Sequence, residues 1–168
     1  VAVRVHAVGL PTVPRLLPCP RPVRRGGWAE GFQRANRRFQ GCQAVESALA
    51  AAATVAANHG ELVSAGDIRR WLREGDVRKV DVIVGGPPCQ GFSALGKRDV
   101  EDVRNALWQQ YAEAVRLAGP KYFVVENVAP FLRSPQLEAF RRRTVGRGGL
   151  RDYTFEARVL NAADYGAP

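Results

Sequence analysis

The chain is organised around VDVIVGGPPCQGFS, which occupies residues 80–93. Its first part, Val80 to Val84, is an apolar and largely β-branched run typical of a buried parallel strand. Two glycines and two prolines then lead the chain out of the sheet as a stiff loop, because proline fixes φ and lacks an amide donor. Cys89 lies at the tip of this loop. Since ligands bind at the carboxyl ends of strands in open α/β sheets, its thiol is a candidate nucleophile.

Strand and helix patterns alternate on both sides of this stretch, which predicts a doubly wound α/β sheet with helices on both faces. Apolar runs that end in polar residues indicate further strands, and alanine-rich or amphipathic segments indicate helices. We expect strands at residues 43–46, 62–64, 121–128 and 153–161, and helices at residues 28–35, 48–58, 68–74, 104–118 and 137–143.

Residues 1–25 differ in composition from the rest of the chain. They contain five of the 11 prolines and five arginines, without any acid. Proline at positions 18, 20 and 22 excludes a helix, so we expect a disordered basic leader. The alternative is an arm that contacts DNA.

Charge and cysteine content limit the function only loosely. A net charge of +9 favours a nucleic-acid partner, but the leader holds much of it, so the support is modest. Three cysteines without metal-ligand spacing predict neither a disulfide framework nor a metal site. The sequence has no apolar run long enough to cross a bilayer and no secretory signal pattern, which predicts a cytoplasmic protein.

Three motifs resemble, in order and spacing, the DNA cytosine-5 methyltransferases of bacterial restriction-modification systems. They are GPPCQGFS at residues 86–93, Glu126-Asn127-Val128, and NAADYGAP at residues 161–168. The resemblance implies a Rossmann-like methyltransferase sheet over residues 26–168, as a partial catalytic domain without the target recognition domain. It also implies transfer of a methyl group from S-adenosylmethionine to C5 of a flipped cytosine in double-stranded DNA, through a covalent adduct between cysteine and C6.

The residue types suit this chemistry. C5 of cytosine is a poor nucleophile until a thiolate adds to C6, and the family gives that role to the residue matching Cys89. Glu126 ends the next strand and can donate to N3 if burial keeps it protonated, while Asn127 would help to fix the loop. The alternatives are a buried structural thiol for Cys89 and a capping or surface acid for Glu126.

Cofactor contacts follow from the resemblance. Glu46, at the end of a strand, would hold the ribose hydroxyls, Asp67 would accept from the adenine amino group, and Ile68 would pack on the ring. Gly27 and Pro87 are further expected contacts. From the residues alone, Glu46 is equally an exposed strand end and Asp67 a plain helix N-cap.

The loop after the cysteine is expected to close over DNA once the target base has left the duplex. Gln90 and Ser93 would bond the phosphate or sugar beside the flipped base, and Lys97 and Arg98 would neutralise phosphates. For Lys97 and Arg98, a solvated charged loop is an equally good interpretation. A cognate restriction endonuclease is the expected biological partner.

Three departures from the family pattern bear on activity. The glycine-rich loop that follows the first strand is reduced to Gly26-Gly27, and Ser47 replaces an aromatic residue. The Gln-x-Arg-x-Arg motif expected after Pro168 is not in the sequence. We therefore expect a sheet that is incomplete at both ends and lacks its first central strand, and little or no activity of the chain alone.

Other interpretations stay open at this point. The chain is alternatively a non-catalytic fragment that binds DNA or cofactor, or one half of a split methyltransferase whose second polypeptide carries the missing motifs. The composition of residues 1–25 also fits a frameshift. A thiol enzyme acting on free pyrimidines is a third class. The sequence gives neither the DNA recognition sequence nor the oligomeric state.

Overall fold

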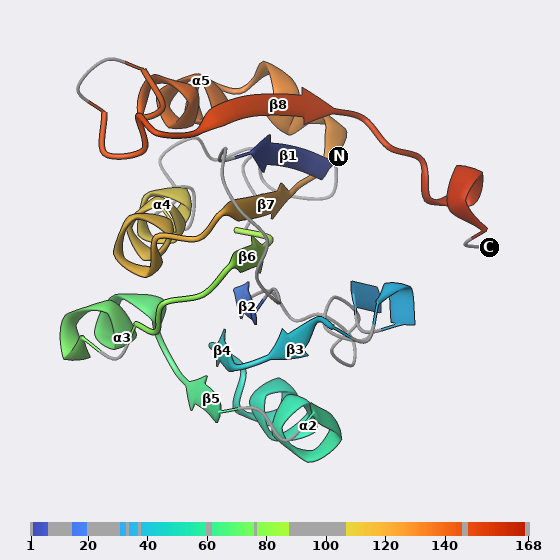
Figure 1. Cartoon of the computed structure of the whole chain (residues 1–168), viewed down its shortest axis with the longest axis vertical. Helices are drawn as coiled ribbons and strands as arrows, with labels where there is room; N and C mark the ends of the chain where they lie inside the picture. Colours follow the sequence, from blue (N-terminus) through green and yellow to red (C-terminus); the bar gives the residue numbers. More distant parts are fainter. Residues whose placement is uncertain are drawn as a thin grey trace.

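The computed structural model describes residues 2–6, 15–19, 31–32, 34–36, 38–59, 62–75, 77–87, 107–145 and 148–166, with the backbone alone for residues 2–6, 15–19, 59 and 62. Within these residues, six strands form one sheet in the order β3-β2-β6-β7-β1-β8, and β4 and β5 form a parallel pair. Figure 1 shows β4 beside β2, so the pair extends the line of strands. The strands are β1 (Ala2–His6), β2 (Arg15–Cys19), β3 (Gln40–Gly41), β4 (Gln43–Glu46), β5 (Leu62–Ala65), β6 (Val82–Gly85), β7 (Tyr122–Glu126) and β8 (Thr154–Arg158).

The strand directions bring the carboxyl ends of two neighbouring strands to the same edge of the sheet. β2, β3, β6 and β7 run parallel, whereas β1 is antiparallel to both of its neighbours, β7 and β8. β6 is buried at every position, as its apolar sequence predicts. The carboxyl ends of β6 and β7 therefore lie next to each other, with Gly85 opposite Val125.

Local signals set the ends of the helices. Asp67 accepts from the backbone of Arg69 at the start of α3, and Gly75 ends that helix with φ of 75°. Ser134 caps α5 by accepting from the backbone of Leu137 at 3.1 Å. The helices are α2 (Leu49–His59), α3 (Ile68–Glu74), α4 (Leu107–Ala118) and α5 (Pro135–Arg142), with the 3₁₀ turns η2 (Ala129–Arg133) and η3 (Ala162–Tyr165). Residues 31–32 and 34–35 are also helical.

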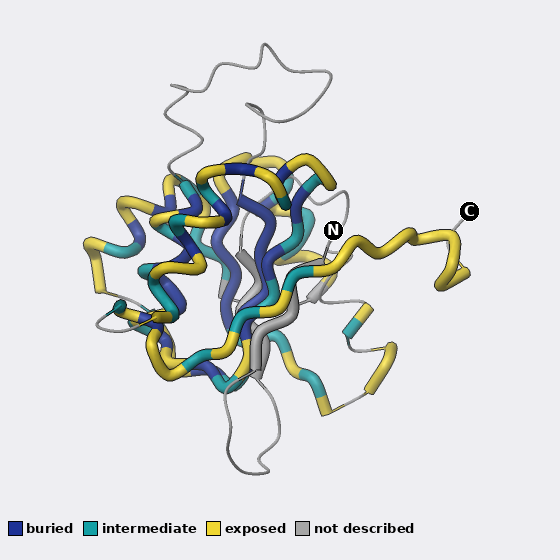
Figure 2. The backbone as a smooth tube through the Cα atoms, turned by 90° about the horizontal axis from the view of Figure 1, so that it is seen from above, coloured by how far each residue is buried: buried dark blue, intermediate teal, exposed yellow. Residues whose placement is uncertain are grey.

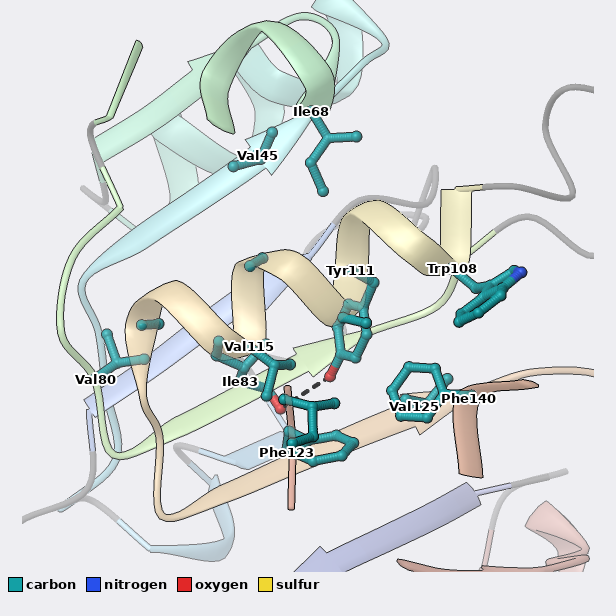
Figure 3. Packing of buried hydrophobic residues seen from close by; sticks show 14 of the residues in the cluster. Val45, Ile68, Val80, Ile83, Trp108, Tyr111, Val115, Phe123, Val125 and Phe140 are labelled. Carbon is teal, nitrogen blue, oxygen red and sulfur yellow. Dashed lines mark hydrogen bonds between the residues drawn. The ribbon is translucent and has the colours of Figure 1, made fainter. Parts of the chain in front are cut away.

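Helices α3, α4 and α5 lie along one face of the strands, and α2 and residues 31–32 and 34–35 lie on the other (Figure 1). On the first face, Phe140 of α5 packs against Trp108, Phe123 and Phe155, with ring centroids 5.5–5.8 Å apart (Figure 3). Arg143 places its guanidinium 5.5 Å from the Trp108 ring. Figure 2 shows the buried residues gathered along the central strands and the inner sides of the helices, with exposed residues around them.

The second face has a smaller apolar cluster. Val82, Val84 and Val124 pack there against Phe32 and Phe39, whose rings meet edge to face at 5.1 Å. The predicted α/β class with helices on both faces is confirmed. In the described part of the chain, no helix is long and apolar enough to span a membrane.

The expectation of disorder in residues 1–25 is wrong for two stretches, because Ala2–His6 and Arg15–Cys19 form β1 and β2. β2 also occupies the central position that the sequence left without a strand, between β3 and β6. Pro18 is compatible with this position, because β3 ends opposite Leu16 and Pro18 is paired on the β6 side alone. The division of the chain at residue 25 stays a prediction.

Candidate active site

A buried asparagine connects the ends of β6 and β7. The Asn127 side chain is 2% exposed; its Nδ2 donates to the backbone oxygen of Pro87 at 3.1 Å, and its Oδ1 accepts from the Val128 amide at 2.9 Å. The Asn127 side chain thus provides hydrogen-bond partners for the Pro87 carbonyl, after the end of β6, and for the Val128 N–H, after the end of β7. This bond fixes Pro87, which precedes Cys89 by two residues in the sequence.

Glu126 is the last residue of β7 and is half-buried. Because side chains alternate along a strand, it shares a face with Val124, on the side covered by Phe32 and Phe39. Asn127 follows it directly. The predicted proton donor therefore lies beside the residue whose side chain binds Pro87.

Tyr111 of α4 connects the same two strands, β6 and β7, within the core. Its hydroxyl donates to the backbone oxygen of Val124 at 2.9 Å and lies 3.5 Å from that of Ile83 (Figure 3). Its side chain is 1% exposed. Tyr111 lies in the helix expected at residues 104–118, and its hydroxyl, among the buried apolar residues of α4, was the signal for this role.

A second pair of predicted residues lies at the ends of β4 and β5. Glu46 is 5% exposed, and its Oε1 accepts from the Ala48 amide at 2.8 Å. The Glu46 carbonyl accepts from the amide of Gly66, the residue before Asp67, at 2.8 Å. The structure therefore brings Glu46 and Asp67 to one edge, and Glu46 is not the exposed strand end that its alternative interpretation required.

Asp67 and Ile68 have structural contacts of their own. Asp67 caps α3 and forms an ion pair with Arg69 at 2.6 Å. The hydrogen bond from Arg69 lowers the pKa of the Asp67 carboxyl. Ile68 is buried in the main core cluster with Val45 and Trp71. The N-cap interpretation of Asp67 is therefore correct, and the cofactor roles of both residues stay predictions.

The remaining predicted site residues are Pro87 and a group that lies outside the described part of the chain. Pro87 is buried and accepts from Asn127. Among the described residues, no group of three or more His, Cys, Asp or Glu side chains is placed to hold a metal ion. Six predicted residues lie outside the described part of the chain: Gly27, Cys89, Gln90, Ser93, Lys97 and Arg98.

Comparison with known proteins assigns the family. Residues 25–168 match the family model for C-5 cytosine-specific DNA methylase. The chain belongs to this family. The match covers both strand edges described above, including the Asn127 bond and the Glu46–Gly66 contact.

Relatives and a solved structure agree with the assignment. The chain is 34% identical over 157 residues to the Type II methyltransferase M.DdeI of Desulfomicrobium norvegicum, covering 85% of this chain and 35% of that protein. It is 42% identical over 107 residues to M1.HphI of Haemophilus parahaemolyticus, covering 58% of this chain and 27% of that one. The Dnmt2 methyltransferase of S. pombe matches with a TM-score of 0.55 at 22% identity, over 77% of this chain and 40% of that chain, which shows the shared fold.

The chain spans only part of the length of these relatives. Among the curated methyltransferases compared, the matched stretch amounts to between 24% and 42% of the relative. Activity, substrate and partners of the whole protein are therefore matters for proposal.

Proposed function

We propose that this chain supplies the catalytic centre of a DNA (cytosine-5-)-methyltransferase. The observation that carries the proposal is the bond from Asn127 to Pro87, which ties the Glu126 strand end to the start of the Cys89 loop. This bond lies within the residues that match the C-5 cytosine-specific DNA methylase family, and the relatives of the chain include Type II methyltransferases.

Cys89 is the proposed nucleophile. Its thiolate would add to C6 of cytosine, which moves the C5–C6 electron pair toward C5 and N3 and leaves an enamine that is nucleophilic at C5. Once C5 carries the methyl group, loss of the C5 proton and departure of the thiolate restore the ring. A residue on a loop of fixed origin loses less entropy in reaching C6 than one on a free segment.

Glu126 would stabilise the charge that develops at N3 during thiolate addition. It needs a proton to donate, so its function requires the protonated carboxyl in the closed complex. Its half-buried position at the end of β7, next to the bond from Asn127 to Pro87, supports this role.

S-adenosylmethionine is the proposed methyl donor; when bound it would supply the methyl group for C5. Glu46 fits the ribose hydroxyls, because it is a buried acid at a strand end held rigid by the Ala48 amide. Asp67 would accept from the adenine amino group with the oxygen atoms it shares with Arg69. Gly27, Ile68 and Pro87 are proposed as further contacts.

Double-stranded DNA is the proposed substrate. Gln90 and Ser93 are assigned to the backbone beside the flipped cytosine, and Lys97 and Arg98 to phosphates. We further propose a restriction-modification role with a cognate endonuclease, in the cytoplasm where chromosomal DNA is accessible. The chain alone is expected to turn over weakly, because its matched stretch amounts to 35% of M.DdeI and 27% of M1.HphI.

Transfer of a tritiated methyl group to mixed-sequence duplex DNA tests the catalytic proposal. We expect weak incorporation at C5 of cytosine that is abolished in Cys89→Ala and retained in Cys42→Ala, since Cys42 packs against the core elsewhere. Incorporation that persists without Cys89 would refute the assignment of the nucleophile.

A thermal melt tests the cofactor edge without requiring turnover. At 100 times its Kd, S-adenosylmethionine should stabilise the chain by about 2.7 kcal/mol, a rise in Tm of roughly 5–10 °C. The rise should vanish in Glu46→Ala and persist in Glu74→Ala, whose acid lies exposed at the end of α3. An unchanged rise in Glu46→Ala would remove Glu46 from the cofactor site.

A further inference from the structure

Strand β8 (Thr154–Arg158) is the end strand of the six-stranded sheet in the described part of the chain. It pairs with β1 on one side, and Figure 1 shows it as the outermost strand on the other side. The outer side of an end strand presents backbone N–H and C=O groups in a row, which is a template for a further strand. Proline, lysine or a bulge commonly protects such an edge. β8 contains neither proline nor lysine, and its ladder with β1 runs without a bulge.

Two side chains of opposite charge lie on the exposed face of β8. Glu156 and Arg158 form an ion pair with each other at 2.5 Å, and their side chains are 47% and 73% exposed. Because side chains alternate along a strand, both lie on the face opposite to Phe155, which packs on Phe140 of the core. Each copy of the chain therefore presents an acid and a base two residues apart beside an unprotected strand edge.

The charges select one register for two β8 strands that pair antiparallel. Directly opposite residues have to point to the same face, so a symmetric pair is centred on a single residue. With Ala157 at the centre, Glu156 of each copy lies opposite Arg158 of the other, which gives two ion pairs between the copies. A centre at Glu156 or at Arg158 places that residue opposite its own copy, and like charges directly opposite each other are destabilising.

The register centred on Ala157 also covers exposed apolar side chains. Val159 and Leu160 directly follow β8 and are 59% and 43% exposed in the single chain. Continued through these two residues, the register places Val159 opposite Phe155 of the second copy, and Leu160 opposite Thr154. Both apolar side chains thereby gain a cross-strand neighbour and lose contact with water.

We propose that the outer edge of β8 is a self-association surface, through which two copies of this chain join their sheets with Ala157 on the two-fold axis. Main-chain hydrogen bonds supply affinity, and the two reciprocal ion pairs fix the register. β7 and β8 run parallel, since both are antiparallel to β1. The two-fold axis reverses the strands of the second copy, so the β6–β7 carboxyl ends of the two copies face opposite ways. The inference goes beyond the proposed function and does not depend on methyl transfer.

Analytical ultracentrifugation of the full chain at several concentrations tests the surface. The original chain should form dimers. Glu156→Arg and Arg158→Glu each replace both ion pairs by like-charge contacts, so either substitution should raise the dimer Kd about tenfold or more. The control is Glu74→Arg, which changes the net charge equally and removes the exposed ion pair of Glu74 with Arg70 on α3. Its dimer Kd should equal that of the original chain.

An equal mixture of the two β8 variants separates pairing between chains from the ion pair within a chain. A Glu156→Arg chain and an Arg158→Glu chain oppose each other with opposite charges at both positions, so their mixture should dimerise with roughly the Kd of the original chain. The ion pair within each chain stays broken, so a merely local role predicts no recovery. The proposal is overturned by an original chain that stays monomeric, by single variants that dimerise undiminished, or by a mixture that does not recover.

Discussion

The carboxyl ends of β6–β7 and of β4–β5 both carry an acid, yet they are held together in different ways. At β6–β7, the bonds come from side chains far away in the sequence: Asn127 to Pro87 and Tyr111 to Val124. At β4–β5, the two acids bind their own neighbours, Glu46 to Ala48 and Asp67 to Arg69. The edge proposed for chemistry therefore depends on tertiary structure, whereas the edge proposed for the cofactor is formed largely by local turns.

Loss of the Asn127 bonds should have the largest effect. Asn127→Leu leaves the Pro87 carbonyl and the Val128 amide without their partner in a buried setting, which should lower the free energy of unfolding by roughly 2–4 kcal/mol. Chemical denaturation would measure this change. Asn58→Leu is the control, because Asn58 lies exposed on α2, and its substitution should be nearly neutral. Equal effects of the two substitutions would show that the Asn127 bonds do not stabilise the ends of β6 and β7.

Tyr153 provides a pH test of a long-range bond. Burial raises the pKa of Tyr153 to about 12, and its hydroxyl donates to the Pro120 carbonyl. Because the folded pKa exceeds the unfolded one, the contribution is complete below about pH 10 and is lost as the pH rises toward 12. The stability difference between the original chain and Tyr153→Phe should therefore shrink by about 1 kcal/mol over that range, less than the full shift because the half-buried ring is partly screened by water. A difference independent of pH would contradict this.

Tyr111→Phe should cost about 1 kcal/mol, the net value of one buried hydrogen bond. The ring and its packing on Phe123 and Phe140 are preserved, so the change isolates the hydroxyl. Tyr165→Phe, at a residue that is 72% exposed, is the matched control. If both variants unfold at the same denaturant concentration, the Tyr111 bond does not hold β6 to β7.

Asp67 should show the smallest effect, because its bonds are local and exposed. Asp67→Ala should cost about 0.5 kcal/mol, the low end for a lost N-cap because Asp67 is exposed, and Asp67→Asn much less, because asparagine also caps helices. Since the pKa of Asp67 is lowered in the fold, its charge contributes above about pH 3.9 and the contribution is lost as the pH falls further. Urea titrations at pH 7 and pH 2.5 would reveal this difference, and an equal loss for Ala and Asn at pH 7 would exclude the cap.

The contrast between local and long-range bonds also explains which helices and strands can be predicted from the sequence. Helix α3 was expected at residues 68–74 and begins and ends there, because Asp67 and Gly75 are local signals. β4 was likewise expected at residues 43–46. β1 and β2 were missed, because their partners are β7, β8 and β6, far along the chain, and proline dominates the local pattern. The bond from Asn127 to Pro87 spans 40 residues, and no local pattern gives its geometry.

The anchoring of Pro87 by Asn127 also has a consequence for local unfolding. The Asn127 side chain follows β7 in the chain, and it binds the backbone oxygen of Pro87, which follows β6. Release of either strand end therefore removes a hydrogen-bond partner from the other, so the ends of β6 and β7 should lose protection from amide exchange together.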